Sequence, residues 1–311
     1  SIVSLSSVSA IGDVITYDNA GSLEEFMRFD TPSAVYSIAW TADSTTFAYG
    51  MADGSVMMNS WSSTGISFPI MSGGHTDAVT SVDFNADETA LFSGGMDGVF
   101  RAWDHTTGTL LSVSDLITTP KTPVIGTVPF IESVAGRPDS PNEVALAGNW
   151  NYIQQTVWNS PVRPGPPSLS GHTNFVFDIE WHPSGDYLAS GGADGTVRLW
   201  NYSTGAQSYI DNFSHTSRVY DVAFTRNGEW LASTGQDRTV WIRPLFSPGE
   251  PALIATIPDI GSDTVINAVD ISLNGDLVAI GDSHGMLRVY SIGGPTTPSG
   301  VLLREIDAHD D

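Results

Sequence analysis

The sequence predicts an all-β repeat protein, and three observations support this fold class. First, His75, His172 and His215 are each followed by a serine 18 residues later and by an aspartate 22 residues later. Second, the segments between these residues alternate apolar and polar side chains with the period of two that half-buried strands show. Third, no stretch combines a 3.6-residue apolar period with helix caps. A unit that recurs about every 43 residues indicates that neighbouring units bury their apolar faces against one another.

Each of the three strong units predicts the same order of strands. The first strand follows the histidine and covers residues 79–84, 176–181 and 219–224. A polar turn leads to a second strand that ends at the serine, and a tight turn containing the aspartate leads to a third strand. A more variable fourth strand then runs into the next unit.

The same order of strands identifies three weaker units. One has its first strand at residues 35–40, and another has it at residues 266–271. A divergent unit runs from 124 to 158 and carries a polar insertion at 137–142. The chain is therefore expected to be nearly all β from about residue 31 onward.

The closing position of the third strand, a tryptophan in the first two strong units, varies elsewhere. Arg243 occupies it in the His215 unit, where Trp241 lies two residues earlier. Asn59 occupies it in the first unit and Tyr290 in the last. We expect the first and last units to be held mainly by apolar packing.

Two sets of motif residues resemble the signature of the WD-repeat β-propeller family: Gly74-His75, Ser93, Asp97-Gly98 and Trp103-Asp104, and Gly171-His172, Ser190, Asp194-Gly195 and Trp200-Asn201. The resemblance covers about residues 31–309. It implies a seven-bladed β-propeller of four-stranded antiparallel blades in a single domain, residues 1–311. The expected blades lie at about residues 1–30, 31–73, 74–118, 119–170, 171–213, 214–262 and 263–311.

The first blade is expected to be incomplete. Residues 2–7, 14–18 and 23–29 fit its second, third and outer strands, and its innermost strand is missing. Three explanations stay open: a longer natural chain was trimmed, the blade has three strands, or a partner chain donates the fourth strand by β-augmentation.

The histidine, serine and aspartate also fit the groups of a hydrolase triad. Repetition argues against that interpretation, because an active site needs one nucleophile and a structural bond is needed once per blade. The resemblance implies that each histidine bridges the serine and the turn aspartate, while the tryptophan completes the chain. The expected structural network is His75, Ser93, Asp97, Trp103, His172, Ser190, Asp194, Trp200, His215, Ser233 and Asp237, and no catalytic residue is expected.

Composition excludes several classes of function. The chain has 35 acidic and 12 basic residues and a formal net charge of −23, so a direct nucleic-acid partner is not expected. It has no cysteine, its seven histidines are dispersed, and no apolar run approaches the ~18 residues of a membrane span, so neither a metal site, a cofactor nor a spanning segment is predicted. A cytoplasmic or nuclear location is favoured, with export or an organelle lumen as the alternative.

The WD-repeat resemblance also implies a partner-binding face at the entry to each innermost strand and at the aspartate turn. The expected contact residues are Tyr36, Met96, Trp150, Phe175, Phe177, Arg218, Tyr220 and Asn267. Large rigid aromatic rings and arginine are typical of binding hot spots. The chain is predicted to be a non-enzymatic interaction scaffold or complex subunit for protein or peptide partners. The alternative is an exported or lumenal propeller that binds a small ligand or carbohydrate, or a hydrolase. Convergent carboxylates at the channel mouth would favour this alternative.

Overall fold

The computed structural model describes residues 2–6, 24–29, 31–43, 45–62, 65–67, 74–115, 129–159, 168–210, 215–245, 252–256, 264–272, 275–292 and 300–307. Within these ranges the regular elements are all strands, numbered β1 to β26. No helix in the described ranges is long and apolar enough to cross a membrane. The prediction of an all-β fold is confirmed.

Six four-stranded sheets and one two-stranded sheet contain these strands, and in each sheet the strands follow one another in chain order. Neighbouring strands are antiparallel, as β7–β8 and β8–β9 illustrate. The first three four-stranded sheets are β3 (Val35–Trp40), β4 (Thr46–Met51), β5 (Val56–Ser62) and β6 (Gly65–Ser67); β7 (Val79–Phe84), β8 (Ala90–Gly95), β9 (Val99–Asp104) and β10 (Leu110–Asp115); and β11 (Ile131–Gly136), β12 (Glu143–Gly148), β13 (Tyr152–Val157) and β14 (Leu169–Ser170).

The remaining three four-stranded sheets are β15 (Val176–Trp181), β16 (Tyr187–Gly192), β17 (Val197–Asn201) and β18 (Gln207–Ile210); β19 (Val219–Phe224), β20 (Trp230–Gly235), β21 (Thr239–Pro244) and β22 (Ala252–Thr256); and β23 (Ile266–Ile271), β24 (Leu277–Asp282), β25 (Met286–Ser291) and β26 (Val301–Asp307). Four-stranded antiparallel sheets are therefore confirmed. The predicted count of seven blades is not, because six such sheets occur in the described residues.

The two-stranded sheet pairs β1 (Ile2–Ser6) with β2 (Glu24–Phe29), starting from Ile2 opposite Phe29. The sequence pattern predicts a further strand, residues 14–18, between these two. That arrangement is wrong, because the two strands share one hydrogen-bonded edge directly and leave no place between them. Residues 14–18 themselves lie outside the described residues.

The chain divides into two compact units. One contains residues 1–30, 189–198 and 210–311, and the other contains residues 31–188 and 199–209. We call the second the 31–188 unit and the first the C-terminal unit. The single-domain organisation stays a prediction.

Within the 31–188 unit, consecutive sheets pack face to face. Ala48 and Met58 on one face of the sheet β3–β6 contact the face of the sheet β7–β10 that carries Phe84, Leu91 and Trp103. Because side chains alternate along a strand, the opposite face of β7–β10 is free to pack on the following sheet, through Phe92 and Phe100. The period-two pattern of the sequence thus produces one buried layer between each pair of sheets.

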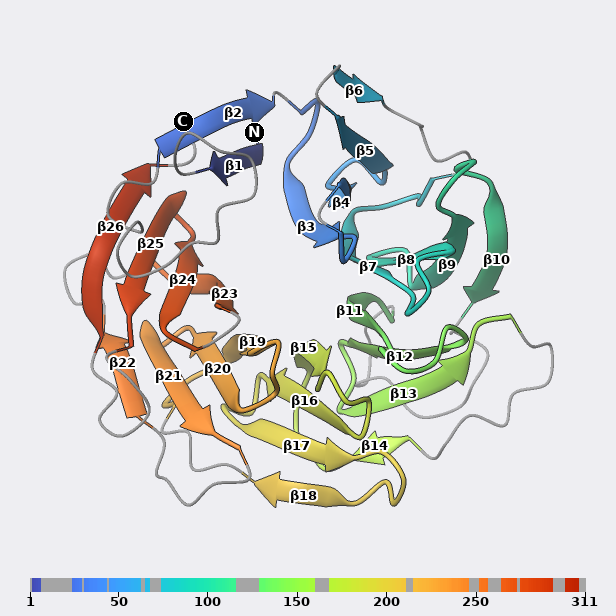
Figure 1. Cartoon of the computed structure of the whole chain (residues 1–311). Coiled ribbons are helices and arrows are strands. Elements are labelled where there is room, and N and C mark those ends of the chain that lie inside the picture. The colour runs from blue at the N-terminus through green and yellow to red at the C-terminus, as the bar shows by residue number, and fades with distance from the viewer. Residues whose placement is uncertain are drawn as a thin grey trace. The chain divides into compact units, whose positions relative to one another are not determined.

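Side-chain hydrogen bonds fasten each first strand to the next. The first strands β3, β7 and β11 lie side by side (Figure 1). Ser37 Oγ accepts from the amide of Val82 at 3.0 Å, and Ser81 Oγ accepts from the amide of Val134 at 3.0 Å. In the C-terminal unit, Asp221 Oδ2 accepts from the amide of Val269 at 2.6 Å. The third residue of a first strand therefore bonds the backbone of the following one.

Candidate functional site

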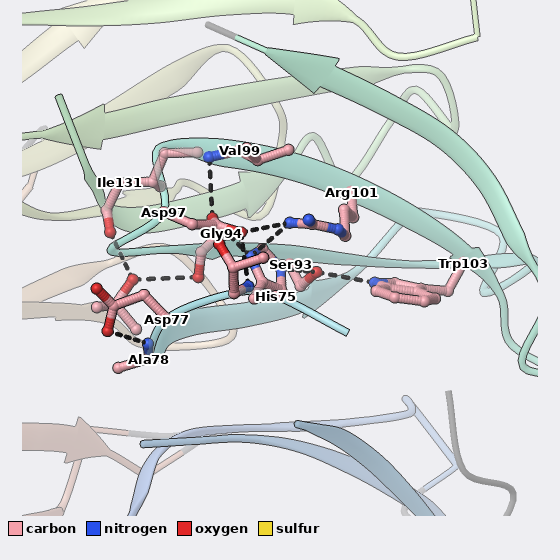
Figure 2. Close-up of polar contacts among 12 residues, drawn as sticks. His75, Asp77, Ala78, Ser93, Gly94, Asp97, Val99, Arg101, Trp103 and Ile131 are labelled. Atoms are coloured by element: carbon pink, nitrogen blue, oxygen red, sulfur yellow. Dashed lines mark hydrogen bonds and ion pairs between the residues drawn. The ribbon is translucent and has the colours of Figure 1, made fainter. Parts of the chain in front are cut away.

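A buried chain of hydrogen bonds links four side chains in the sheet β7–β10. Trp103 Nε1 donates to Ser93 Oγ at 2.8 Å, and Ser93 Oγ lies 2.8 Å from His75 Nε2. His75 Nδ1 lies 2.8 Å from Asp97 Oδ1. Figure 2 shows these side chains converging from β8, β9, the turn between them and the segment before β7. A neutral histidine that donates through Nδ1 and accepts through Nε2 satisfies every group in the chain.

The surroundings favour a neutral His75 beside an ionised Asp97. Burial lowers the pKa of His75, and Arg101 lowers it further, against the raising effect of Asp97. Burial would raise the pKa of Asp97, but His75 and nearby backbone amides hold it well below its ordinary value. Ser93 has no exposed surface, so no substrate can reach its hydroxyl. The arrangement can hold a sheet together, but it does not present a nucleophile.

Sequence reasoning missed an arginine that extends this network. Arg101 Nη1 donates to Asp97 Oδ2 at 2.9 Å. Arg198 occupies the same position in the next strong unit, 3.6 Å from Asp194. Both arginines follow the turn aspartate by four residues, and that repeated spacing is the signal that could have found them.

The sheet β19–β22 builds the network with a substitute donor. His215 Nε2 lies 2.8 Å from Ser233 Oγ, and His215 Nδ1 lies 3.1 Å from both carboxylate oxygens of Asp237. Trp241, two residues before the expected position, donates to Thr239 Oγ1 at 3.0 Å, and Thr239 in turn donates to Asp237 at 2.7 Å. The indole therefore reaches the aspartate through a threonine hydroxyl instead of reaching the serine.

The second strong unit buries its expected network residues. His172, Ser190 and Trp200 are 3 %, 0 % and 1 % exposed. The rings of His172 and Trp200 lie with their centroids 6.1 Å apart. Buried side chains of this kind can hold a sheet together by hydrogen bonds, whereas a catalytic side chain must be accessible to its substrate.

The last sheet contains a buried ion pair that the repeat pattern does not predict. Arg288 Nη1 donates to Asp282 Oδ2, and both side chains are almost fully buried, at 5 % and 0 % exposed. Arg288 Nε also lies 2.5 Å from Glu305 Oε2 on β26. Tyr290 belongs to the apolar core of this sheet, as expected. Apolar packing is therefore accompanied by a charged pair that ties β24, β25 and β26 together.

The expected partner-binding residues of the 31–188 unit differ in exposure. Tyr36 is 55 % exposed and Met96 is 41 % exposed. Phe175 and Phe177 are half-buried. Trp150 is only 5 % exposed, because it packs in the apolar layer beside Phe92 and against Tyr152, and its assignment to an exposed rim is corrected to the core.

In the C-terminal unit, Arg218 and Asn267 are exposed and Tyr220 is half-buried. Three of the expected contact residues share a backbone feature, because the pairing register shifts across Tyr36, Tyr220 and Asn267. A bulge of this kind redirects a side chain away from the regular alternation of its strand. The sequence pattern alone does not reveal such bulges.

A pocket of about 320 Å³ lies at the other end of the first strands of the 31–188 unit. Its polar lining consists of Ser37, Ser81, Asp83, Ser133, Asp178 and Glu180. Ser133 Oγ donates to Asp178 Oδ1 at 2.9 Å. In the described part of the chain, no group of three or more histidine, cysteine or acidic side chains is arranged to hold a metal ion.

Asp83 is the most strongly perturbed carboxyl of this pocket. Burial raises its pKa to about 7, against two backbone hydrogen bonds that lower it, and Asp178 raises it further. The bonds come from the amides of Gly136 at 2.7 Å and Phe84 at 2.9 Å. A Cβ at Gly136 would lie 2.4 Å from the carbonyl oxygen of Phe84, so only glycine brings this amide close enough.

The raised pKa of Asp83 predicts a pH dependence of stability. Between about pH 4 and pH 7 the folded state binds the proton that the unfolded state has already lost, so the free energy of unfolding falls as pH rises through this window. Asp83→Asn keeps an acceptor for Gly136 and removes the titration. We therefore expect the variant to gain stability relative to the wild type as pH rises from about 4 to 8, by a few kcal/mol. Urea unfolding at four pH values measures the difference in stability. Asp87→Asn, at an exposed position, is the control. Parallel pH dependences of stability for the wild type and Asp83→Asn would contradict the prediction.

Comparison with known proteins identifies the repeated unit. The sequence model of the family described as WD domain, G-beta repeat, matches residues 68–104, 166–201 and 207–242. The chain contains three WD repeats. Two of the three matches straddle two sheets: the match at 166–201 covers β14 to β17, and the match at 207–242 covers β18 to β21. Each of these two repeats thus supplies the outer strand of one sheet and the first three strands of the next, whereas the match at 68–104 covers β7 to β9.

Similar proteins share parts of this WD-repeat chain. It is 32 % identical to Periodic tryptophan protein 2 of Arabidopsis thaliana over 54 % of the chain and 17 % of that protein. It is 27 % identical to Restriction of telomere capping protein 1 of Kluyveromyces lactis over 45 % of the chain and 11 % of that protein. It is 28 % identical to Ribosome biogenesis protein YTM1 of Scheffersomyces stipitis over 43 % of the chain and 27 % of that protein. The chain thus matches less than a third of the length of each of these relatives.

Proposed function

We propose that this WD-repeat protein is a non-enzymatic scaffold, or a subunit of a multiprotein complex, that binds protein or peptide partners. Relatives named for ribosome biogenesis and telomere capping support a role in assemblies, and such a role fits a nuclear or cytoplasmic location. The buried serine hydroxyls support the absence of catalysis by the repeated network. The observation that carries the proposal is the exposure of large apolar side chains where the first strands begin.

The proposed contact surface of the 31–188 unit, called the aromatic rim, consists of Tyr36, Met96, Phe175 and Phe177. Tyr36 and Met96 each leave more than two fifths of their surface in solvent. The aromatic rings of this surface provide contact area with few rotamers to immobilise, and Met96 adds an adaptable apolar side chain. In the C-terminal unit, Arg218, Tyr220 and Asn267 occupy the corresponding places and complete the proposal.

Truncating the aromatic rim should weaken partner binding without unfolding the protein. We expect Tyr36→Ala combined with Met96→Ala to reduce the recovery of specific partners at least about tenfold, since hot-spot side chains contribute roughly 2 kcal/mol or more each. Affinity purification from cells followed by quantitative mass spectrometry measures the recovery. Leu111→Ala with Val113→Ala removes comparable exposed apolar surface from the outer strand β10 and is the matched control. Equal recovery of every partner by the two double variants would remove the case for the rim.

We also infer that the sheets belong to a seven-bladed propeller whose seventh blade includes β1 and β2. Ile38 and Trp40 are 43 % and 44 % exposed on β3. Their counterparts on β7, Val82 and Phe84, pack against the preceding sheet. This exposed apolar face supports a further blade before β3, completed by the same chain or by a strand from a partner. Small-angle scattering, which distinguishes a closed ring from an open arc of six sheets, tests it.

A further inference from the structure

We propose that Glu132 determines the specificity of the partner-binding surface, by accepting the guanidinium of an arginine from a partner peptide. Glu132 is the second residue of β11 and belongs to the same unit as the aromatic rim. This role rests on the proposed scaffold function and adds to it the chemistry that the surface recognises.

The backbone places Glu132 at the same position as a residue of the rim. The pairing register of β11 shifts across Glu132, as it shifts across Tyr36 on β3 and across Thr80 on β7. Such a bulge redirects the side chain out of the regular alternation of its strand. Thr80 Oγ1 donates to the carbonyl oxygen of Ile131, so a side chain at this position can reach the beginning of the following first strand. For Glu132 the following first strand is β15 (Figure 1).

The carboxylate of Glu132 is half-buried and has no donor to satisfy it. Among the residues that the structure describes, neither an amide nor a side chain donates a hydrogen bond to this carboxylate. Burial raises the pKa of Glu132 to about 7, and no neighbouring charge contributes to this shift. A carboxylate that has lost water without gaining a donor favours a ligand that supplies one. The charged side chains on the elements packed against β11, and directly after it, are Asp83, Arg137, Glu143, Asp178 and Glu180.

A guanidinium suits this position better than an ammonium does. Its planar fork can donate two parallel hydrogen bonds to one carboxylate, and it is more weakly hydrated than an ammonium. Phe175 and Phe177 are half-buried at the beginning of β15 and add aromatic surface, on which a guanidinium can stack. The formal net charge of −23 favours the approach of a basic peptide.

Binding of the arginine should strengthen as pH rises through about 7. Only the ionised carboxylate of Glu132 pairs with the guanidinium, which stays charged throughout this range. We expect the peptide acetyl-Leu-Arg-Leu-amide to bind about tenfold more tightly at pH 8 than at pH 6. Titration calorimetry in two buffers of different ionisation enthalpy measures the affinity and should show that binding at pH 7 releases protons. An affinity that does not change with pH would overturn the role of Glu132.

Glu132→Gln keeps the shape of the side chain and removes its charge. At pH 8 this variant should bind the arginine peptide at least about tenfold more weakly than the wild type and lose the pH dependence. It should resist urea at least as well as the wild type at pH 8, because it removes a half-buried charge that has no partner in the described residues. Asp87→Asn removes an equal charge from an exposed turn of the same unit and should leave the affinity unchanged. Equal affinities of the wild type and Glu132→Gln would contradict the proposal.

Two further peptides test the ligand on the wild-type protein. Acetyl-Leu-citrulline-Leu-amide has nearly the same shape without the charge and should bind at least about tenfold more weakly. Tighter binding of acetyl-Leu-Lys-Leu-amide than of the arginine peptide would overturn the assignment to arginine.

Recovery of partners from cells distinguishes this proposal from the scaffold function. We expect Glu132→Gln to lose the partners that bind through an arginine. If Tyr36→Ala with Met96→Ala loses its partners while Glu132→Gln keeps all of them, the role of Glu132 is wrong and the scaffold function stands. Full recovery in both variants would overturn both.

Discussion

Replacing Arg288 with methionine is expected to lower the free energy of unfolding by about 3–5 kcal/mol. Asp282 has no exposed side-chain surface, and Arg288 is its cationic partner. Without the guanidinium, an ionised carboxylate would be left buried and uncompensated. The penalty therefore arises more from the stranded charge than from the lost attraction. Urea unfolding followed by circular dichroism measures the change.

A double variant distinguishes this cause from simple loss of packing. Asp282→Asn keeps an oxygen acceptor for the amides of His284 and Met286, which bond Asp282 Oδ1 at 2.9 Å and 3.2 Å. Combined with Arg288→Met, it removes both charges. We expect the double variant to be more stable than Arg288→Met alone. A double variant at least as unstable as the single one would show that packing, and not the unpaired charge, accounts for the loss.

Replacing Trp103 with alanine is expected to cost about 3–5 kcal/mol, the range typical of a buried large aromatic residue. Trp103 is 0 % exposed and belongs to the apolar layer between two sheets. Trp103→Phe keeps most of this layer but removes the donor to Ser93, so we expect it to cost about 1–3 kcal/mol. Thermal and urea unfolding of both variants separate the apolar contribution from the hydrogen bond.

Leu111→Ala provides a surface control in the same sheet. Leu111 is 46 % exposed on β10, so its loss should cost less than about 1 kcal/mol. Wild-type stability in Trp103→Phe would mean that the chain of bonds from indole to aspartate adds nothing beyond packing. The sheet β19–β22 offers an internal comparison, because its indole bonds Thr239 instead of a serine.

Much of the architecture could be predicted because the motif residues recur at fixed separations in the sequence. The distances from His75 to Ser93 and to Asp97 place these side chains on one sheet, and the structure joins them by hydrogen bonds. Alternation with a period of two located the first strands, since one face of each must be buried. Because these patterns recur in several units, they are unlike a match that arises once by chance.

Features that depend on single positions were not predictable. The burial of Trp150 depends on how the divergent third sheet packs, which no repeat pattern specifies. The Asp282–Arg288 pair uses an aspartate where four of the other sheets carry glycine, so alignment with them gave no hint of it. The pocket around Asp83 forms from strands of four different sheets, and only coordinates bring Ser37 and Glu180 to one cavity.

Two repeats, at 166–201 and 207–242, each contribute strands to two sheets, and this has a consequence for how such a chain can be duplicated or cut. A duplicated repeat brings an outer strand that completes the preceding sheet. It also brings, at the third residue of its first strand, a hydroxyl or carboxylate that accepts a hydrogen bond from a backbone amide of the following first strand. Gene duplication therefore lengthens the array without leaving an exposed strand edge at the junction. Truncation between two such repeats has the opposite effect. The sheet before the cut loses its outer strand, because that strand belongs to the repeat that has been removed.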